Sequence, residues 1–242
     1  MIIMIPKIIH YCWFGHGEMP DLAQKCIASW HKYMPDWDFK LWNEDVFDVS
    51  IVPYTKEAYE AKKFAFVSDY VRLWALFKEG GLYLDTDVEV FKSFDDLLKY
   101  NAFAGFEGSK HMPVGTCVMA SEADGKWIKE QLDYYKNRHF VNPDGSFDLT
   151  TNVQFITARM CEQGFDTNGK EQDFNDLHVF PVEYFSPRQT TGEYIRTENT
   201  YSDHLGLASW NAKSKGWKCL VRKVFGQRIM TRLIKIKRKI FG

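Results

Sequence analysis

The sequence predicts a single α/β domain with a mostly parallel central sheet flanked by helices. The chain has 242 residues, a length typical of one domain. It is 45% hydrophobic and 26% charged, which fits a globular protein and excludes a coiled coil or a disordered chain. Its first half alternates strand-like and helix-like segments, the order that is typical of parallel sheets.

A strand, a helix and a second strand open the chain. Residues 7–14 are rich in β-branched and aromatic side chains and run into Gly15, which predicts a buried strand that ends in a loop. Residues 20–33 carry apolar side chains at helical spacing, and residues 37–42 alternate as a strand does. This unit is the start of the expected sheet.

A long helix and a third strand follow. Residues 55–79 carry an apolar stripe and end at Gly80, a residue typical of a helix C-terminus. Residues 82–91 alternate strictly, which predicts one continuous strand. The side chains expected on one face of this strand are those of Tyr83, Asp85, Asp87 and Glu89. Further strands are expected near 102–106, 115–120 and 177–181, and further helices near 125–138 and 150–163.

Basic residues are concentrated at the C-terminal end. Residues 213–242 hold 11 of the 31 Lys and Arg and no acidic residue, whereas the other residues carry 20 basic and 32 acidic side chains. Residues 217–240 interleave basic and apolar side chains, a pattern suited either to an anionic membrane surface or to docking on the domain. Nucleic acid is not expected as a partner, because the acidic body would repel it. We therefore expect a folded domain over 1–212 and a basic amphipathic helical segment over 213–242.

Asp85 and Asp87 are the first candidates for a functional site. Carboxylates two residues apart on a strand point to the same side and can share Mn²⁺ or Mg²⁺ with phosphate oxygens. The other interpretation is a solvated turn, and the chain contains a second such pair, Asp36 and Asp38, at a strand-entry turn. Asp85 and Asp87 differ because they come late in an apolar strand, where α/β sheets bind ligands.

A helical group and a tryptophan are further candidates. Ser68, Asp69 and Arg72 lie in the long helix, with the two charged side chains on one face. They form either an intrahelical ion pair or a site for sugar hydroxyls and diphosphate oxygens, and their apolar neighbours favour the site. Trp13 ends the first strand and either stacks on a nucleobase or fills the core.

Candidates in the second half are less specific. His204 is either a third metal or phosphate ligand or a packed histidine, and Ser209 and Trp210 are placed to close over a leaving diphosphate. Glu107 and Asn152 either face an acceptor or serve as turn and cap residues.

These residues occur in an order that resembles a known family. The order runs from Ile5 through Gly15 to Ser68-Asp69-Tyr70-Val71-Arg72, then Gly80-Gly81-Leu82-Tyr83-Leu84-Asp85-Thr86-Asp87, and finally residues 204–210. It resembles the glycosyltransferases that contain the D-x-D motif, often numbered family 32. That family includes capsular polysaccharide transferases, fungal initiating mannosyltransferases and glucosylating toxins. The resemblance covers 5–107 and returns near 201–210.

The resemblance implies a GT-A-like fold and a hexosyltransferase dependent on Mn²⁺ or Mg²⁺. It implies a UDP- or GDP-sugar donor, a saccharide or lipid-linked saccharide acceptor, retention of anomeric configuration and a role in surface polysaccharide synthesis such as capsule formation. The catalytic residues that it implies are Asp69, Arg72, Asp85 and Asp87. The donor-binding residues that it implies are Trp13, Ser68, Asp69, Arg72, Tyr83, Asp85, Ser209 and Trp210. The metal ligands that it implies are Asp85, Asp87 and His204.

Two other functions use some of the same residues. A metal-dependent phosphohydrolase acting on nucleotide sugars would use carboxylates and a histidine to activate water, but such enzymes usually cluster more ligands. A non-catalytic sugar-binding protein would use the aromatic side chains and leave Asp85 and Asp87 without a purpose. The five widely spaced cysteines indicate free thiols in a reducing compartment. With the basic segment, they place the expected enzyme in the cytoplasm, attached peripherally to the inner face of the cell membrane.

Overall fold

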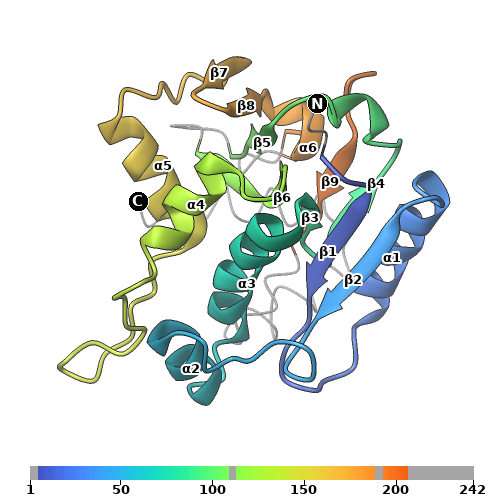
Figure 1. Ribbon diagram of the computed structural model, residues 1–242. Helices are drawn as coiled ribbons and strands as arrows, with labels where there is room; N and C mark the ends of the chain where they lie inside the picture. Colours follow the sequence, from blue (N-terminus) through green and yellow to red (C-terminus); the bar gives the residue numbers. More distant parts are fainter. Residues whose placement is uncertain (1–4, 109–112, 189–192, 207–242) are drawn as a thin grey trace, which may run out of the picture.

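A seven-stranded mixed sheet in the order β2-β1-β3-β6-β5-β8-β7 forms the centre of the molecule in the computed structural model, which describes residues 5–108, 113–188 and 193–206 (Figure 1). Its strands are β1 (Ile8–Cys12), β2 (Asp38–Trp42), β3 (Gly81–Leu84), β5 (Ala102–Phe106), β6 (Val114–Ser121), β7 (Gln172–Phe174) and β8 (Leu177–Phe180). A second, two-stranded sheet pairs β4 (Val88–Val90) with β9 (Ser202–His204).

Helices pack on both faces of the central sheet, so that there are two apolar cores. The helices are α1 (Asp21–Tyr33), α2 (Pro53–Glu60), α3 (Phe64–Glu79), α4 (Lys126–Asp133), α5 (Asn152–Glu162) and α6 (Val182–Phe185), with a 3₁₀ turn η1 (Asp95–Leu97). One core lies under α3 and includes Val71 and Tyr83, and the other includes Trp30 of α1 and Leu82. Tyr83 and Leu82 are neighbours on β3, so this strand supplies both cores by alternation.

The predicted α/β class with a helix-flanked sheet is confirmed. The β1 strand runs parallel to both β2 and β3, and β5 runs parallel to β8. The β6 strand is antiparallel to both β3 and β5, and β7 is antiparallel to β8. The parallel arrangement expected from the first half of the sequence therefore holds there, and the second half adds antiparallel strands. The strands β7 and β9 were not predicted.

The single helix predicted over 55–79 is wrong in one respect, because the chain forms two helices. Lys62 has a φ of 56°, in the left-handed region that ends helices. Its N–H donates to the carbonyl of Tyr59, and the N–H of Lys63 donates to the carbonyl of Ala58. These hydrogen bonds close the end of α2 before α3 begins at Phe64. The apolar periodicity continues across the break, so the break is invisible to it.

The single strand predicted over 82–91 is also wrong. The β3 strand ends at Leu84, and residues 85–87 form a turn in which the Val88 N–H donates to the Asp85 carbonyl at 2.9 Å. The β4 strand then changes partner and pairs with β9 in the second sheet. The D-x-D segment therefore lies in the turn between two sheets rather than along one face of a strand.

Two glycines make the connection from α3 into β3. Gly80 and Gly81 have φ values of 64° and 111°, which favour glycine. A Cβ atom on Gly81 would lie 2.6 Å from the backbone oxygen of Ile8 on β1. Gly81 thus lets β3 approach β1 closely and sets the start of the strand that leads to Asp85.

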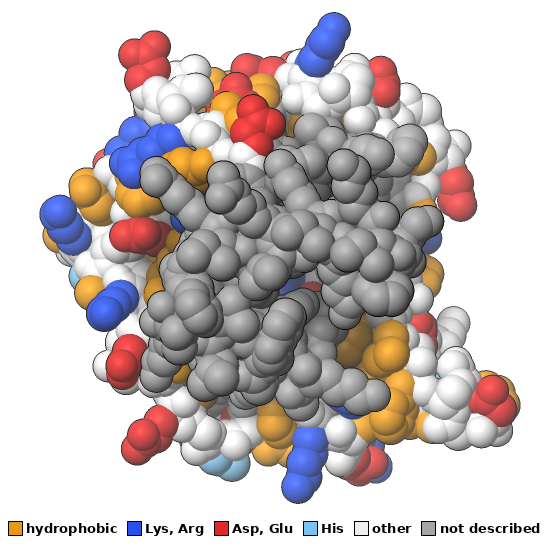
Figure 2. All heavy atoms as spheres, turned by 180° about the vertical axis from the view of Figure 1, so that it is seen from behind, with side chains coloured by type: hydrophobic (Ala, Val, Ile, Leu, Met, Phe, Trp, Pro, Cys, Tyr) orange, Lys and Arg blue, Asp and Glu red, His pale blue; other side chains and the backbone are white. Residues whose placement is uncertain are grey.

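The described surface carries charges of both signs. Figure 2 shows acidic and basic side chains interspersed around the rim of one face. Among the described residues, none of the helices combines the length and apolarity needed to cross a bilayer. The basic segment predicted over 213–242 lies outside the described residues.

Candidate cation and donor site

The turn after β3 and the end of β9 bring three metal-binding side chains together. His204 pairs with Val88 in the β4–β9 ladder, and its Nε2 atom lies 3.3 Å from Oδ1 of Asp87. One ligand atom from each of Asp85, Asp87 and His204 lies within 4.8 Å of the others. Two carboxylate oxygens and an imidazole nitrogen suit a divalent cation such as Mn²⁺ that also takes phosphate oxygens. The residues present therefore fit the cation that the sequence implied.

Asp85 is held in place by a buried arginine. Nη1 of Arg72 lies 3.2 Å from Oδ1 of Asp85 and donates to the backbone oxygen of Thr116 at 2.6 Å. Nη2 of the same guanidinium lies 3.1 Å from Oδ1 of Asp69. Arg72 is 5% exposed and Asp69 is 8% exposed, so both ends of this ion pair are buried.

Burial and neighbouring charges shift the pKa values of Asp69 and Arg72 in opposite directions. Burial raises the pKa of Asp69 to about 6, although the Arg72 charge and the Asn152 N–H both favour its ionised form. Burial alone would lower the pKa of Arg72, but the Asp85 carboxylate and other neighbours hold that pKa well above its ordinary value. Arg72 is therefore a fixed positive charge behind Asp85.

Tyr83 supports the same carboxylate from below. Its hydroxyl donates to Oδ1 of Asp85 at 2.9 Å, and the Arg72 guanidinium lies 4.5 Å from its ring centroid. Only 1% of Tyr83 is exposed. The structure therefore places the Tyr83 hydroxyl where it orients Asp85.

Trp13 and Ser68, which are also predicted to bind the sugar donor, form hydrogen bonds with residues outside the Asp85–Asp87–His204 group. Trp13 follows the end of β1 and is half-buried, with its backbone N–H bonded to the Trp42 carbonyl. Ser68 donates its hydroxyl to the Phe64 carbonyl at 3.1 Å, within its own helix. Ser209 and Trp210 lie outside the described residues.

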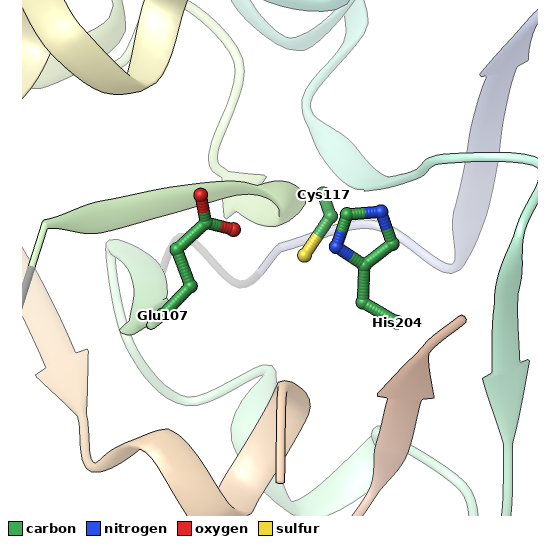
Figure 3. A group of neighbouring side chains, drawn as sticks. All are labelled: Glu107, Cys117 and His204. Carbon is green, nitrogen blue, oxygen red and sulfur yellow. The ribbon is translucent and has the colours of Figure 1, made fainter. Parts of the chain in front are cut away.

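Asn152 serves the fold, and Glu107 lies in the site region. Asn152 is fully buried at the start of α5, where its backbone N–H donates to Oδ2 of Asp69 and its side chain donates to the Asp69 carbonyl. The cap of α5 is Thr151, so Asn152 does not serve as the cap and instead joins α5 to α3. Glu107 is partly exposed, and its carboxylate lies close to Cys117 and His204 (Figure 3).

Sequence reasoning missed two residues of this region. The Thr116 carbonyl accepts from Arg72, and the Cys117 carbonyl accepts from the Asp85 N–H at 2.9 Å. Both residues belong to β6, whose eight residues are all buried. A cysteine within a buried strand has no sequence signal that separates it from ordinary core residues.

The surroundings of His204 favour its protonated form when no cation is bound. Burial by itself lowers the pKa of His204, but its contacts with Cys117 and Asp87 outweigh burial and raise the pKa well above the ordinary value. A positive group is thus favoured at this position, as expected beside two carboxylates.

Comparison with known proteins finds glycosyltransferases among the proteins that this chain resembles. Residues 20–104 match the family described as the glycosyltransferase sugar-binding region containing the DXD motif. The chain is 35% identical over 106 residues to inositol phosphoceramide mannosyltransferase 3 of Schizosaccharomyces pombe, covering 41% of this chain and 29% of that protein. It is 30% identical over 151 residues to mannosyl phosphorylinositol ceramide synthase CSH1 of Saccharomyces cerevisiae, covering 57% of this chain and 38% of that protein.

The matches to these two relatives thus span about a third of the relatives' own length. Among solved structures, the PaToxG glycosyltransferase aligns with a TM-score of 0.44 at 18% identity, over 54% of this chain and 60% of that chain. The match over 20–104 contains Asp69, Arg72, Asp85 and Asp87, and it confirms the resemblance found in the sequence. Over residues 20–104 the chain is therefore similar to the glycosyltransferase family whose sugar-binding region contains the DXD motif.

Proposed function

We propose that this chain is a divalent-cation-dependent hexosyltransferase that moves a sugar from a UDP- or GDP-sugar to a saccharide or lipid-linked saccharide. The observation that carries the proposal is the convergence of Asp85, Asp87 and His204 from two separate parts of the chain. This convergence, within a chain that is similar to the DXD family, favours sugar transfer over simple sugar binding, which has no need of the three ligands.

The names of two relatives narrow the donor and the acceptor. Both names mention a mannosyl group and a ceramide that carries phosphate and inositol. A mannose donor and a lipid-bearing acceptor are therefore the first pair to test for this chain. Retention of configuration and a role in surface polysaccharide synthesis belong to the same proposal.

The chain's own residues would share the work as follows. Asp85, Asp87 and His204 would hold Mn²⁺ or Mg²⁺, which neutralises charge on a departing nucleoside diphosphate. Arg72 and Tyr83 fix the orientation of Asp85 through the contacts described above. Asp69 keeps Arg72 in place through its ion pair.

The donor's base and diphosphate have proposed partners as well. Trp13 lies at the carboxyl end of β1, where ligands of α/β sheets bind, and its ring would stack on the base. Ser209 and Trp210 would contact the diphosphate. Ser68 would take part through its place beside Asp69 in α3.

A donor panel tests the proposal. UDP- and GDP-sugars are supplied with Mn²⁺ and a mixture of saccharide and lipid-linked acceptors, and both nucleotide release and sugar incorporation are measured. We expect incorporation that needs the cation and is abolished in Asp87→Asn. Asp38→Asn is the matched control, because it removes an exposed carboxylate from the chain's other D-x-D.

The two other functions give different results in the same panel. Nucleotide release at an equal rate with and without acceptor would indicate a phosphohydrolase and contradict the proposal. Sugar binding that needs no cation and gives no turnover would indicate a binding protein. Either result is read against the unchanged Asp38→Asn control.

We also propose that residues 217–240 attach the enzyme to an anionic membrane surface at the inner face of the cell membrane. The proposal rests on the basic and apolar side chains of this segment, which lies outside the described residues. We expect the full chain to co-sediment with anionic vesicles and not with neutral ones, and a chain without 217–242 to lose this binding. Equal sedimentation of both chains would contradict the proposal.

A further inference from the structure

A second group of possible metal ligands shares His204 with the proposed cation site. The group consists of Glu107, Cys117 and His204, and one ligand atom from each lies within 4.8 Å of the others. Figure 3 shows the three side chains converging from separate segments, with the Cys117 sulfur between the Glu107 carboxylate and the His204 ring. Sulfur, nitrogen and carboxylate oxygen together are a donor set typical of Zn²⁺, whereas Mn²⁺ and Mg²⁺ prefer oxygen.

The local structure keeps this group in place. Cys117 is 3% exposed in β6, and its sulfur also lies 3.5 Å from the Ser186 hydroxyl oxygen. The Glu107 backbone N–H donates to the Pro113 carbonyl at 2.9 Å. A Cβ atom on Gly115 would lie 3.0 Å from Oε2 of Glu107, so the missing side chain leaves room for this carboxylate.

The two groups of possible ligands lie on different sides of the His204 ring. In Figure 3 the ring nitrogen next to the attachment carbon, Nδ1, faces the Cys117 sulfur, and Nε2 points away from it. Nε2 is the atom that lies 3.3 Å from Asp87. A neutral imidazole has one nitrogen with a free lone pair and one that carries hydrogen. His204 can therefore ligate through one side at a time.

We propose that Glu107, Cys117 and His204 form a second cation site for a thiophilic divalent ion such as Zn²⁺. When this site is occupied, His204 is not available as a ligand to a cation held by Asp85 and Asp87. Binding of the ion releases two protons to solvent, the thiol proton of Cys117 and the Nδ1 proton of the protonated His204. Nδ1 then ligates the ion, and the Nε2–H remains a hydrogen-bond donor to the Asp87 carboxylate. The site itself does not depend on the proposed transferase activity, but the competition between cations rests on it.

Cobalt absorption tests the site without any measure of activity. Co²⁺ replaces Zn²⁺ as a visible probe, and its bond to a thiolate gives a charge-transfer band in the near ultraviolet. We expect the full chain to show this band, Cys117→Ser to lose it and Glu107→Gln to weaken Co²⁺ binding at least about tenfold. Cys161→Ser, which removes an exposed thiol outside the group, should keep the band.

Three variants separate the two sites. We expect Asp87→Asn to lose Mn²⁺ binding and keep the cobalt band, Cys117→Ser to show the reverse, and His204→Ala to lose both. In the wild type, saturating Zn²⁺ should weaken Mn²⁺ binding about tenfold, within the usual range for coupled sites, and it should have no such effect in Cys117→Ser. Mn²⁺ binding is followed by electron paramagnetic resonance of the free ion.

Several results would overturn the inference. They are a cobalt band that survives in Cys117→Ser, a band lost in Cys161→Ser, and Co²⁺ affinity that is unchanged in both Glu107→Gln and His204→Ala. Failure of the proposed function gives a different pattern, in which sugar transfer and Mn²⁺ binding are absent while the cobalt results stand. Melting curves without metal show whether each variant is folded, and Glu107→Gln provides the test if Cys117→Ser is not.

Discussion

Nη1 of Arg72 lies 3.2 Å from Oδ1 of Asp85, so a buried guanidinium contacts a proposed metal ligand directly. The same guanidinium also contacts Asp69 and the Thr116 carbonyl. Arg72 thus joins α3, β6 and the turn after β3, and the position of Asp85 depends on all three elements.

Replacing Arg72 tests this relationship. Arg72→Lys keeps the charge but loses the planar fork, and we expect turnover to fall at least about tenfold. Arg72→Met leaves the buried Asp69 carboxylate unpaired and should lower the free energy of unfolding by about 3–5 kcal/mol. Urea denaturation and a transfer assay measure the two effects. Full activity in Arg72→Lys would contradict the positioning role.

Tyr83→Phe removes one hydroxyl and keeps the ring. Because that hydroxyl donates to Asp85, we expect Mn²⁺ binding to weaken about 10- to 100-fold, as it does when second-layer partners of metal ligands are lost. Stability should fall by about 1 kcal/mol. Tyr70→Phe, a buried tyrosine of the same core, is the control and should leave Mn²⁺ affinity unchanged.

His10 should give the fold an acid-sensitive component. The Trp42 indole N–H donates to its Nδ1 at 3.1 Å, so its Nε2–H donates to the Gly80 carbonyl at 2.7 Å. Burial lowers the pKa of His10 below its ordinary value. Its neutral form thus stabilises the fold above the unfolded-state pKa near 6.5, and this contribution is lost as the pH falls from there towards the lower folded-state pKa, by up to about 1.4 kcal/mol per pH unit.

Denaturation in urea at pH 7.5 and 5.5 measures this component. The loss of stability between the two values should be smaller in His10→Gln than in the wild type. His31→Gln, which replaces an exposed histidine on α1, should behave like the wild type. An equal loss of stability in all three proteins would show that folding does not lower the pKa of His10.

Gly81→Ala tests the close approach of β3 to β1. The added Cβ would meet the Ile8 backbone oxygen at 2.6 Å, and the φ of 111° strains any side chain. We expect a loss of about 2–4 kcal/mol in thermal or urea unfolding. Gly17→Ala is the matched control, because nothing lies within 4 Å of its Cβ position, and it should be close to neutral.

The sequence predicted which segments are helical or extended better than it predicted where each element ends and which strand it pairs with. Alternation over 82–91 is real, since Val88 and Val90 are buried, but alternation does not reveal that the pairing strand changes after Leu84. Helical periodicity likewise continues through Lys62, whose left-handed φ belongs to a residue with no such preference. Both errors arise because local patterns record burial and not the identity of the neighbour.

The candidate site shows the same division. Asp85 and Asp87 carry a local motif, whereas the residues around His204 leave both a ligand and a packed histidine open, and the family resemblance favours the ligand. Cys117 and Thr116 lie in a buried strand whose pattern indicates packing alone. Their contacts with Arg72, Asp85 and His204 come from tertiary structure, which the local pattern of a sequence does not reveal.

The short ladder between β4 and β9 brings His204 to a site whose other two proposed ligands lie in the stretch that matches the family. The recognisable stretch ends at residue 104, whereas the histidine arrives on Ser202–His204, far downstream. A fragment trimmed to residues 20–104 would still match the family and would lack the histidine of the proposed cation site. A match to the recognisable stretch therefore says nothing about whether a chain also has the strand that supplies this histidine.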